Sequence, residues 1–473
     1  MTWSKSRLFA FSGIVFAILA GYKTVQHLTF NTYAYDLGIR ASILYNMAFQ
    51  GRVWDSLNNL HGFSGHFHPI SYLLAGLYWI WPNPLLLCLL QALAASAGLL
   101  LFVLLMDRLV EDKRKHVALI ALFLANPFLH NVLCYDFHPE IFAIPLVLLF
   151  FFLMERSEGY NKDIGVKLNW GGTGRGRPQG NTKYLLGLLP AFCLLALKED
   201  MGLLVFSLGI YALARRKWLM GSLMAVVGLA WLPFVLTLVI PHFHAQGQTP
   251  LISLHYQVLG SSSAEIMGTL LKNPWLVLTQ VFARSETLVT IALLAASVGS
   301  LALARWEVLL VLPLLFAQLV SDYPHQMALT WQYSAGILPL LFFSMIKGAG
   351  KVRVGIMWLL AALAIPSAVM RFPNPFVQGV HTQRIRDTYR VIKMIPDTAS
   401  VAVSNNLAPH LVNRRNVRLY PETDDARFIL VDLEANIYPA TWGARYEELE
   451  RLSAGYRRVY SEEGLVLVEK NAD

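Results

Sequence analysis

The chain of 473 residues is 55% hydrophobic and only 15% charged, and its mean hydropathy is +0.47. One soluble core does not need so much apolar surface, so the composition excludes an ordinary soluble protein and predicts an integral membrane protein. The formal net charge is +9, but the tail from Arg371 onward holds 14 Lys/Arg against 14 Asp/Glu. The whole positive excess therefore lies in the membrane part, which argues against a nucleic-acid partner.

Apolar runs predict about eleven transmembrane helices, because a simple span needs about 20 apolar residues. With the N-terminus in the cytoplasm, the inward segments hold 19 Lys/Arg and the outward segments before the tail hold six. This positive-inside bias predicts that the tail lies outside the cytoplasm. The runs lie near residues 8–28, 84–106, 117–133, 139–154, 184–197, 201–214, 218–240, 287–304, 307–320, 331–346 and 354–370.

The first outward segment, about residues 29–83, is dense in aromatic and histidine side chains and is predicted to be structured. An amphipathic helix is expected from Asp36 to Phe49, and residues 70–81 are expected to lie at the membrane interface. The carboxylate of Asp36 suits a general base acting on a hydroxyl, or an oxygen ligand for a divalent ion. The alternative is that Asp36 is the N-cap of the helix that follows it.

Two histidines of the same segment, His66 and His68, lie two positions apart in His66-Phe67-His68-Pro69. In an extended segment their imidazoles face the same way and can share a metal or a phosphate. The alternative is a pair of solvated loop histidines.

A pentad between two apolar runs, Asp136-Phe137-His138-Pro139-Glu140, gathers two carboxylates and an imidazole in a tight turn. Proline breaks a helix, and charge kept at membrane depth is costly, so this turn is interpreted as part of a functional site. A plain polar turn is the alternative.

A third cluster, Lys198-Glu199-Asp200, separates the short runs 184–197 and 201–214. Its lysine is a candidate phosphate partner, because an ammonium needs only proximity to an anionic oxygen. The alternative is an internal ion pair that satisfies a short outer turn. Gln332 and Tyr333 also lie outward on this topology, where single polar residues are more often solvated surface than ligands.

The chain is predicted to divide into a membrane part, residues 1–370, and a small extracytoplasmic α/β domain, residues 371–473. Ile385, Tyr389 and Ile392 form one helical face, and Gly443–Leu452 suits a second helix. Strands are predicted at 400–403, 427–432, 457–460 and 465–469.

Taken in order, these motifs resemble those of a family of bacterial polytopic membrane proteins whose biochemical activity is not established. The resemblance runs through Tyr35-Asp36-Leu37-Gly38, His66-Phe67-His68-Pro69, Asn126-Pro127, the pentad, Lys198-Glu199-Asp200, Gln332-Tyr333 with Pro339, and Pro409-His410-Leu411. The layout in turn is similar to the GT-C class of membrane glycosyltransferases. That likeness implies a helical membrane protein in the bacterial inner membrane, with a catalytic acid in the first outer loop and a soluble C-terminal domain outside.

The GT-C resemblance implies that a sugar passes from a polyprenyl-phosphate donor to an extracytoplasmic acceptor. Asp36 is then the general base, with Lys198, Glu199 and Asp200 in the catalytic group. Lys198 and a histidine, His66 or His68, neutralise the leaving phosphate. Substrate contacts are expected from His66, His68, Asp136, His138, Glu140, Gln332 and Tyr333. The chain departs from the class because Asp36 is single and the acids at 136 and 140 are widely spaced.

Some GT-C members hold a divalent metal, for which Asp36, Asp136 and Glu140 are the candidates here. Two other functions stay open. A transporter or flippase of a lipid-linked intermediate would use the same charges as an ion path, although motifs on one side of the membrane argue against alternating access. A non-catalytic scaffold for cell-envelope assembly would tolerate loss of Lys198, Glu199 and Asp200.

Overall fold

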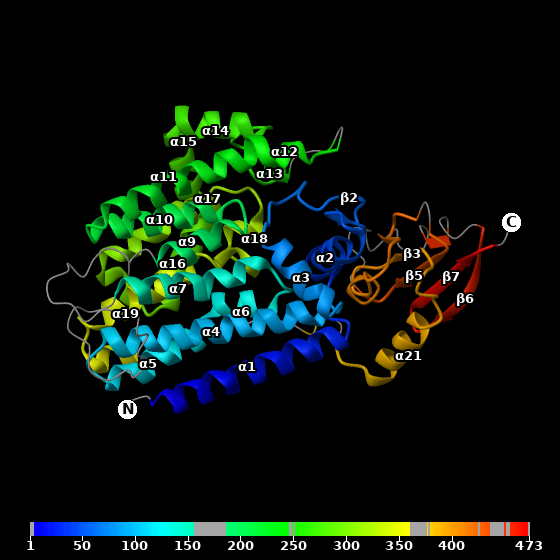
Figure 1. Ribbon diagram of the computed structural model, residues 1–473, viewed down its shortest axis with the longest axis horizontal. Helices are drawn as coiled ribbons and strands as arrows, with labels where there is room; N and C mark the ends of the chain where they lie inside the picture. The colour runs from blue at the N-terminus through cyan, green and yellow to red at the C-terminus, as the bar shows by residue number, and fades with distance from the viewer. Residues whose placement is uncertain are drawn as a thin grey trace, which may run out of the picture.

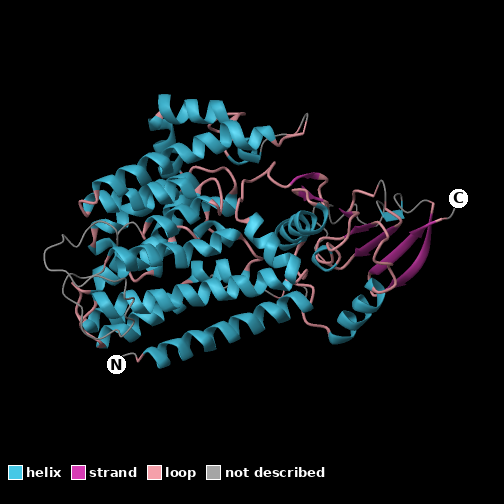
Figure 2. Ribbon diagram, in the orientation of Figure 1, coloured by secondary structure: helices cyan, strands magenta, loops and turns pink. Residues whose placement is uncertain are grey.

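Apolar helices fill one end of the molecule and a small mixed sheet stands at the other (Figures 1 and 2). The computed structural model describes residues 4–155, 186–245, 248, 251–359, 376, 379–423, 426–435, 449–450 and 455–471. The N-terminus and the sheet lie at opposite ends of helix α1 (Lys5–Leu28), as Figure 1 shows. The chain is thus mainly helical, as the composition predicts.

Three helical segments are long and apolar enough to cross a membrane, namely Ser6–Leu28 of α1, α4 (Leu85–Leu109) and Trp218–His242. The last joins α11 (Trp218–Phe234), η3 (Val235–Val239) and α12 (Ile240–His242). Counting three bent pairs as one span each raises the number to six within the described residues. These pairs are α5 (Arg114–Leu124) with α6 (Pro127–Cys134), α15 (Pro274–Ala283) with α16 (Ser285–Ser297), and Pro324–Ser334 with α19 (Leu338–Ala349). The finer count of eleven stays a prediction, and most of run 354–370 lies outside the described residues.

Shorter helices also belong to the bundle. They are α7 (Ala143–Met154), α9 (Leu188–Leu195), α10 (Met201–Ala214), α13 (Leu251–His255), α14 (Ser263–Lys272), α17 (Leu312–Leu319) and α18 (Pro324–Met327). Single turns are η2 (Pro139–Phe142), η4 (Leu301–Ala304), η5 (Trp306–Val311) and η6 (Trp331–Ser334). α10 and α11 approach so closely that a Cβ on Gly209 would lie 2.6 Å from the backbone nitrogen of Ala225. Such contacts between small residues are the usual way for apolar helices to pack where lipid removes the hydrophobic driving force.

The first outer loop is folded, as predicted. It contains the π-helical turn η1 (Ala34–Gly38), α2 (Ile39–Gln50), the short pair β1 (Trp54–Asp55) and β2 (Leu60–His61), and α3 (Ser71–Ile80). The expected helix after Asp36 therefore starts with a wide turn. α3 exposes Tyr72, Leu73, Trp79 and Ile80 over more than half of their surface, which suits a helix at the membrane interface.

The C-terminal sheet has the strand order β4-β3-β5-β7-β6, with β3 parallel to β4 and β5 and the other pairs antiparallel. Together with helix α21 (Thr382–Ile392) it forms the C-terminal unit. Four predicted strands are confirmed as β3 (Val401–Val403), β5 (Phe428–Asp432), β6 (Tyr456–Glu462) and β7 (Leu465–Lys470), while β4 (Val417–Leu419) was not predicted. Most of the expected helix 443–452 lies outside the described residues. The unit packs on the first outer loop, which lies between it and the bundle (Figure 1).

Candidate functional site

Asp36 lies on the π-turn η1 and contacts the pentad through His138. One carboxylate oxygen is 2.9 Å from Nε2 of His138, and the other accepts a hydrogen bond of 2.5 Å from the hydroxyl of Tyr135. Burial alone would raise the pKa of Asp36, but the charge and hydrogen bonds of His138, with the Tyr135 bond, hold that pKa below its usual value. The carboxylate is therefore ionised, and it is not an N-cap, since Tyr33 and Gly38 hold those positions.

The wide turn depends on a glycine. The N–H of Gly38 donates to the carbonyl of Tyr33 five residues earlier, and a Cβ on Gly38 would meet Leu57 at 3.2 Å. A glycine thus lets the turn lie against the loop that follows β1. Single π-turns in otherwise α-helical segments are frequently found at functional sites, and here the turn presents Asp36.

Asp136 supports the same turn instead of meeting Glu140. Its carboxylate accepts the backbone N–H of Tyr33 at 2.6 Å, directly before η1. Burial raises the pKa of Asp136 to about 7, against the lowering effect of Lys23, which lies near it. Asp136 therefore lies next to the candidate site and holds the backbone at the start of the π-turn.

The three side chains of Lys198-Glu199-Asp200 take three different partners. Nζ of Lys198 is 3.1 Å from Glu140, and Glu199 lies 2.7 Å from Nδ1 of His66. Glu199 also accepts the N–H of Phe67, while Asp200 accepts a bond from Gln318. Lys198 therefore pairs outside the triad, and among the described residues no ion pair joins it to Glu199 or Asp200. The cluster links α10 to the pentad and to the first outer loop.

The two acids of this cluster have pKa values shifted in opposite directions. Burial would raise the pKa of Glu199, but His66 and Lys198 outweigh burial and lower it to about 2. Burial and the neighbouring acids Glu199 and Glu140 raise the pKa of Asp200 to about 6, although Lys198 opposes them. Burial disfavours the ammonium of Lys198, yet Glu140 and both acids beside it raise its pKa above the ordinary value. Lys198 is therefore a fixed cation.

The imidazoles of His66 and His68 bind different partners and do not face one shared ligand. His66 faces Glu199, whereas Nδ1 of His68 lies 2.5 Å from the carbonyl of Leu197. Nε2 of His68 is buried without a hydrogen-bond partner. Burial lowers the pKa of both imidazoles, so His68 is neutral and only its free nitrogen is available to a ligand.

The expected metal ligands are not assembled. Asp36 is bound to His138 and Tyr135, Asp136 to the backbone of Tyr33, and Glu140 to Lys198. Among the residues that the structure describes, no group of three or more His, Cys, Asp or Glu side chains is placed to hold a metal ion. The donor set therefore does not fit a divalent metal.

Two residues of the cluster were missed from the sequence. Arg40 on α2 interacts electrostatically with the carboxylates of Glu140, Asp36 and Glu199. It makes no hydrogen bond or ion pair with another described residue. It follows Asp36 by four residues, a helical spacing that places both on one face and that would have identified it. Tyr135 directly precedes the pentad, but nothing in the sequence links it to Asp36, 99 residues away.

An apolar cavity of about 460 Å³ adjoins the cluster. His66, Lys198, Glu199, Asp200 and Tyr333 line its polar end. Its apolar wall comes from α10, α11, η3, α14, α15 and α17 and includes Leu203, Leu229, Leu232, Leu236, Ile266, Leu270, Val277 and Phe316. The ammonium of Lys198 lies 5.5 Å from the ring centroid of Tyr333.

Several buried polar atoms of the predicted site lack a hydrogen-bond partner among the described residues. They are Nε2 of His68, Oε2 of Glu140, Oδ1 of Asp200 and Oε1 of Gln332. Buried polar atoms are normally satisfied, so each such atom calls for a water or a ligand. Their gathering around the three clusters indicates a site that receives hydrogen-bond donors.

A sequence profile for a family described as "Predicted membrane protein (DUF2079)" matches residues 26–161 and 180–467. Among solved structures, the crystal structure of ArnT from Cupriavidus metallidurans bound to undecaprenyl phosphate matches with a TM-score of 0.42 and 12% identity. That match covers 96% of this chain and 97% of the ArnT chain, but the two are too dissimilar for function to be carried across. No functionally curated protein matches the chain.

Proposed function

The chain belongs to the DUF2079 family of predicted membrane proteins, and from that premise we propose that it is a membrane glycosyltransferase of the GT-C type. It transfers a sugar from a polyprenyl-phosphate-linked donor to an acceptor outside the cytoplasm. The observation that carries this proposal is an apolar cavity that ends in a cluster of buried charges. A lipid phosphate has the same two parts, an apolar chain and an anionic head.

The apolar wall suits the lipid chain. A volume of about 460 Å³ lies within the usual range of small-molecule pockets, so it accommodates the first isoprene units next to the phosphate. Leu229 lines the cavity and is also 57% exposed on α11, one of the candidate spans. The remaining length of the chain thus has an apolar surface to follow into the bilayer.

The cations suit the phosphate. Lys198 lines the cavity, and Arg40 interacts electrostatically with Glu140, the partner of Lys198. Arg40 offers a guanidinium that no described residue engages, and a guanidinium fits two phosphate oxygens at once. Lys198 and Arg40 together stabilise the phosphate as it leaves, while the free nitrogen of His68 and the acceptor oxygens of Asp200 and Gln332 bind hydroxyl groups of the substrates.

The chemistry follows from Asp36. The acceptor hydroxyl replaces the Tyr135 hydroxyl on the carboxylate and gives its proton to Asp36 as its oxygen attacks the anomeric carbon. The new bond from this oxygen to carbon forms while the bond from carbon to the phosphate oxygen breaks. The electron pair of the broken bond leaves with the lipid phosphate, which Lys198 and Arg40 stabilise. Attack from the face opposite the phosphate inverts the anomeric centre.

Replacing Asp36 by Asn tests the proposal. Asn cannot take up the proton, so we expect the transfer of radiolabelled sugar from polyprenyl-phosphate donors to fall by a factor of about 100 or more in purified protein in nanodiscs. Asp387→Asn is the matched control, because Asp387 lies on α21 and, among the described residues, bonds to Gln383 and Arg390 of the same helix. Transfer by Asp36→Asn at the rate of the control would remove Asp36 as the base.

A further inference from the structure

The C-terminal unit contacts the segment that carries Asp36, and we propose that Asn405 of this unit is a positioning residue for the Asp36 carboxylate. The soluble unit would then be part of the site and not a separate module. The inference rests on the proposed function only in naming Asp36 as the reacting base.

The contact lies at the first residue of the π-turn. The N–H of Ala34 donates to both the backbone carbonyl and the side-chain Oδ1 of Asn405, each at 2.9 Å. Ala34 is fully buried and Asn405 is 4% exposed, so water does not replace these bonds. The preceding N–H, that of Tyr33, donates to Asp136. Free N–H groups at the start of a helical turn need partners, and here two different parts of the chain supply them.

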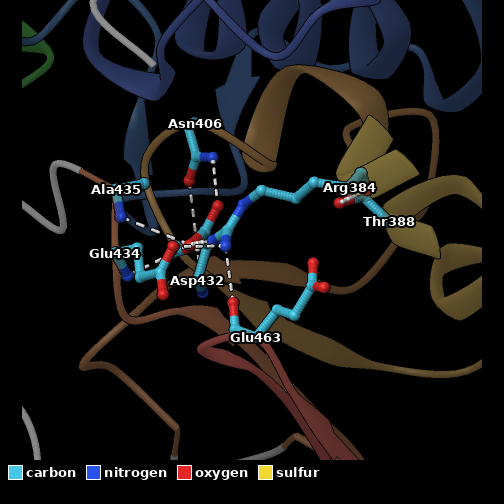
Figure 3. A network of polar contacts seen from close by, with 8 residues as sticks. Arg384, Thr388, Asn406, Asp432, Glu434, Ala435 and Glu463 are labelled. Atoms are coloured by element: carbon cyan, nitrogen blue, oxygen red, sulfur yellow. Dashed lines mark hydrogen bonds and ion pairs between the residues drawn. The ribbon is translucent and has the colours of Figure 1, made fainter. Parts of the chain in front are cut away.

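The loop that bears Asn405 is itself held by a polar network (Figure 3). Asn406 donates to Asp432 at 3.0 Å, and Asp432 pairs with Arg384 of α21. The N–H of Ser404 donates to the carbonyl of Leu430. Ser404 to Asn406 follow β3, and Asp432 ends the parallel neighbour β5, so the network joins the carboxyl ends of two strands. Asn405 is therefore fixed by the fold of the whole unit.

Other bonds seat the unit on the same loop without touching the turn. Asn413 accepts from the hydroxyl of Tyr78 at 2.7 Å and donates to the carbonyl of Pro82 at 2.6 Å. The N–H of Leu419 donates to the carbonyl of Leu57. Asn413 is thus an interface asparagine at the far side of α3, and it provides a matched control for Asn405.

The geometry makes Asn405 a positioning residue, since it reaches Asp36 only through the backbone of Ala34. Its loss would leave the turn supported by Asp136 and by the Asn405 backbone. A small displacement of a reacting carboxylate is enough to slow chemistry by one to two orders of magnitude, roughly. No described residue of the C-terminal unit lines the proposed lipid-binding cavity, so donor binding would be spared.

Hydrogen–deuterium exchange of the full chain in nanodiscs tests the support without any assay of activity. We expect the amides of residues 33–38 to exchange about tenfold faster in Asn405→Ala. Asn405→Asp keeps an acceptor oxygen for Ala34 and should exchange like the wild type. Asn413→Ala should leave residues 33–38 unchanged while loosening residues 78–82. Unchanged exchange at 33–38 in Asn405→Ala would overturn the proposal.

Kinetics then separate positioning from general stability. For sugar transfer from a polyprenyl-phosphate donor, Asn405→Ala should lower kcat by about tenfold or more with the donor KM unchanged. Asn405→Asp should restore most of kcat, and Asn413→Ala should keep it. A rise in KM, or equal losses in the two alanine variants, contradicts the proposal. If wild-type protein transfers no sugar, the proposed function fails while the exchange result still decides whether Asn405 holds the turn.

Discussion

The charged side chains of this protein satisfy one another across long stretches of sequence. Lys198 and Glu199 are adjacent in the chain, yet one pairs with Glu140 and the other with His66. A buried charge must be paired or it destabilises the fold, so each of these ion pairs joins two segments. Arg40 departs from this pattern, because it lies among carboxylates without a direct partner in the described part of the chain.

Arg40 therefore supports a prediction about binding. A hydrogen bond to a charged group contributes about 1.5 to 3 kcal/mol, so we expect Arg40→Gln to weaken the binding of a polyprenyl phosphate by about 10- to 100-fold. Arg40→Lys keeps the charge but not the paired donors, and should lose less. Native mass spectrometry of the protein with added polyprenyl phosphate measures this without turnover.

Arg52 provides the control for Arg40. It lies just past α2 on the same loop and faces the ring of Trp54, away from the cluster. Arg52→Gln should bind the lipid phosphate like the wild type. Equal affinities for the Arg40 and Arg52 variants would show that Arg40 does not contact the phosphate.

At the scale of elements, the C-terminal unit is attached to the end of α1 through a buried pair of imidazoles. His410 stacks on His27 at the end of α1, with ring centroids 4.3 Å apart, and also contacts Phe30. Burial and the neighbouring His27 hold the pKa of His410 well below its ordinary value near 6.5. The docked unit thus prefers the neutral imidazole, and a proton favours the undocked state.

The sign of the pH effect follows from this depressed pKa. Docking is at full strength above the ordinary pKa and weakens as the pH falls below about 6.5, by up to 1.4 kcal/mol per unit, roughly. We expect protease cleavage in residues 29–33 and 379–381 to be faster at about pH 5 than at about pH 7.5. His410→Phe keeps the stack but removes one of its two imidazoles, so its cleavage rates should respond less to pH between these values than those of the wild type. A wild type that is equally resistant at both values would contradict the prediction.

The sequence predicted elements better than contacts. α10 has its predicted bounds and four strands appear where alternation and β-branched residues indicated them. β4 was missed because three residues interrupted by Arg418 carry too little pattern. The π-turn was missed because its cause is a long-range contact of Gly38 with Leu57 and support from Asn405.

For the candidate site, likewise, the sequence identified the residues but not their contacts. Charges inside apolar runs identified the clusters, because such charges are costly at membrane depth. Their partners depended on tertiary packing, since the bond from Tyr135 to Asp36 and the pair of Lys198 with Glu140 join distant segments. Asp136 was accordingly given a ligand-binding role, whereas its carboxylate holds the backbone of Tyr33.

At the scale of the whole molecule, the candidate site lies where the helical bundle meets the first outer loop and the C-terminal unit (Figure 1). The opposite end carries its own buried ion pairs, in which Lys347 bridges Glu307 and Glu155. Lys347 lies in a segment that the positive-inside bias of the sequence predicts to be cytoplasmic. An enzyme needs its substrates to reach the site from one face, whereas a transporter must open the site to both.

Single cysteines separate these two functions. In a variant with Cys193 replaced by Ser, we expect a membrane-impermeant maleimide to label Arg386→Cys on α21 in spheroplasts and Lys351→Cys only in inverted vesicles. Both residues are exposed, so labelling reports the side of the membrane. Ser263 lines the cavity. Ser263→Cys should be labelled from the same side as Arg386→Cys, because a one-sided enzyme never opens the cavity to the cytoplasm. Labelling of Ser263→Cys from both sides would instead support alternating access and transport of a lipid-linked intermediate.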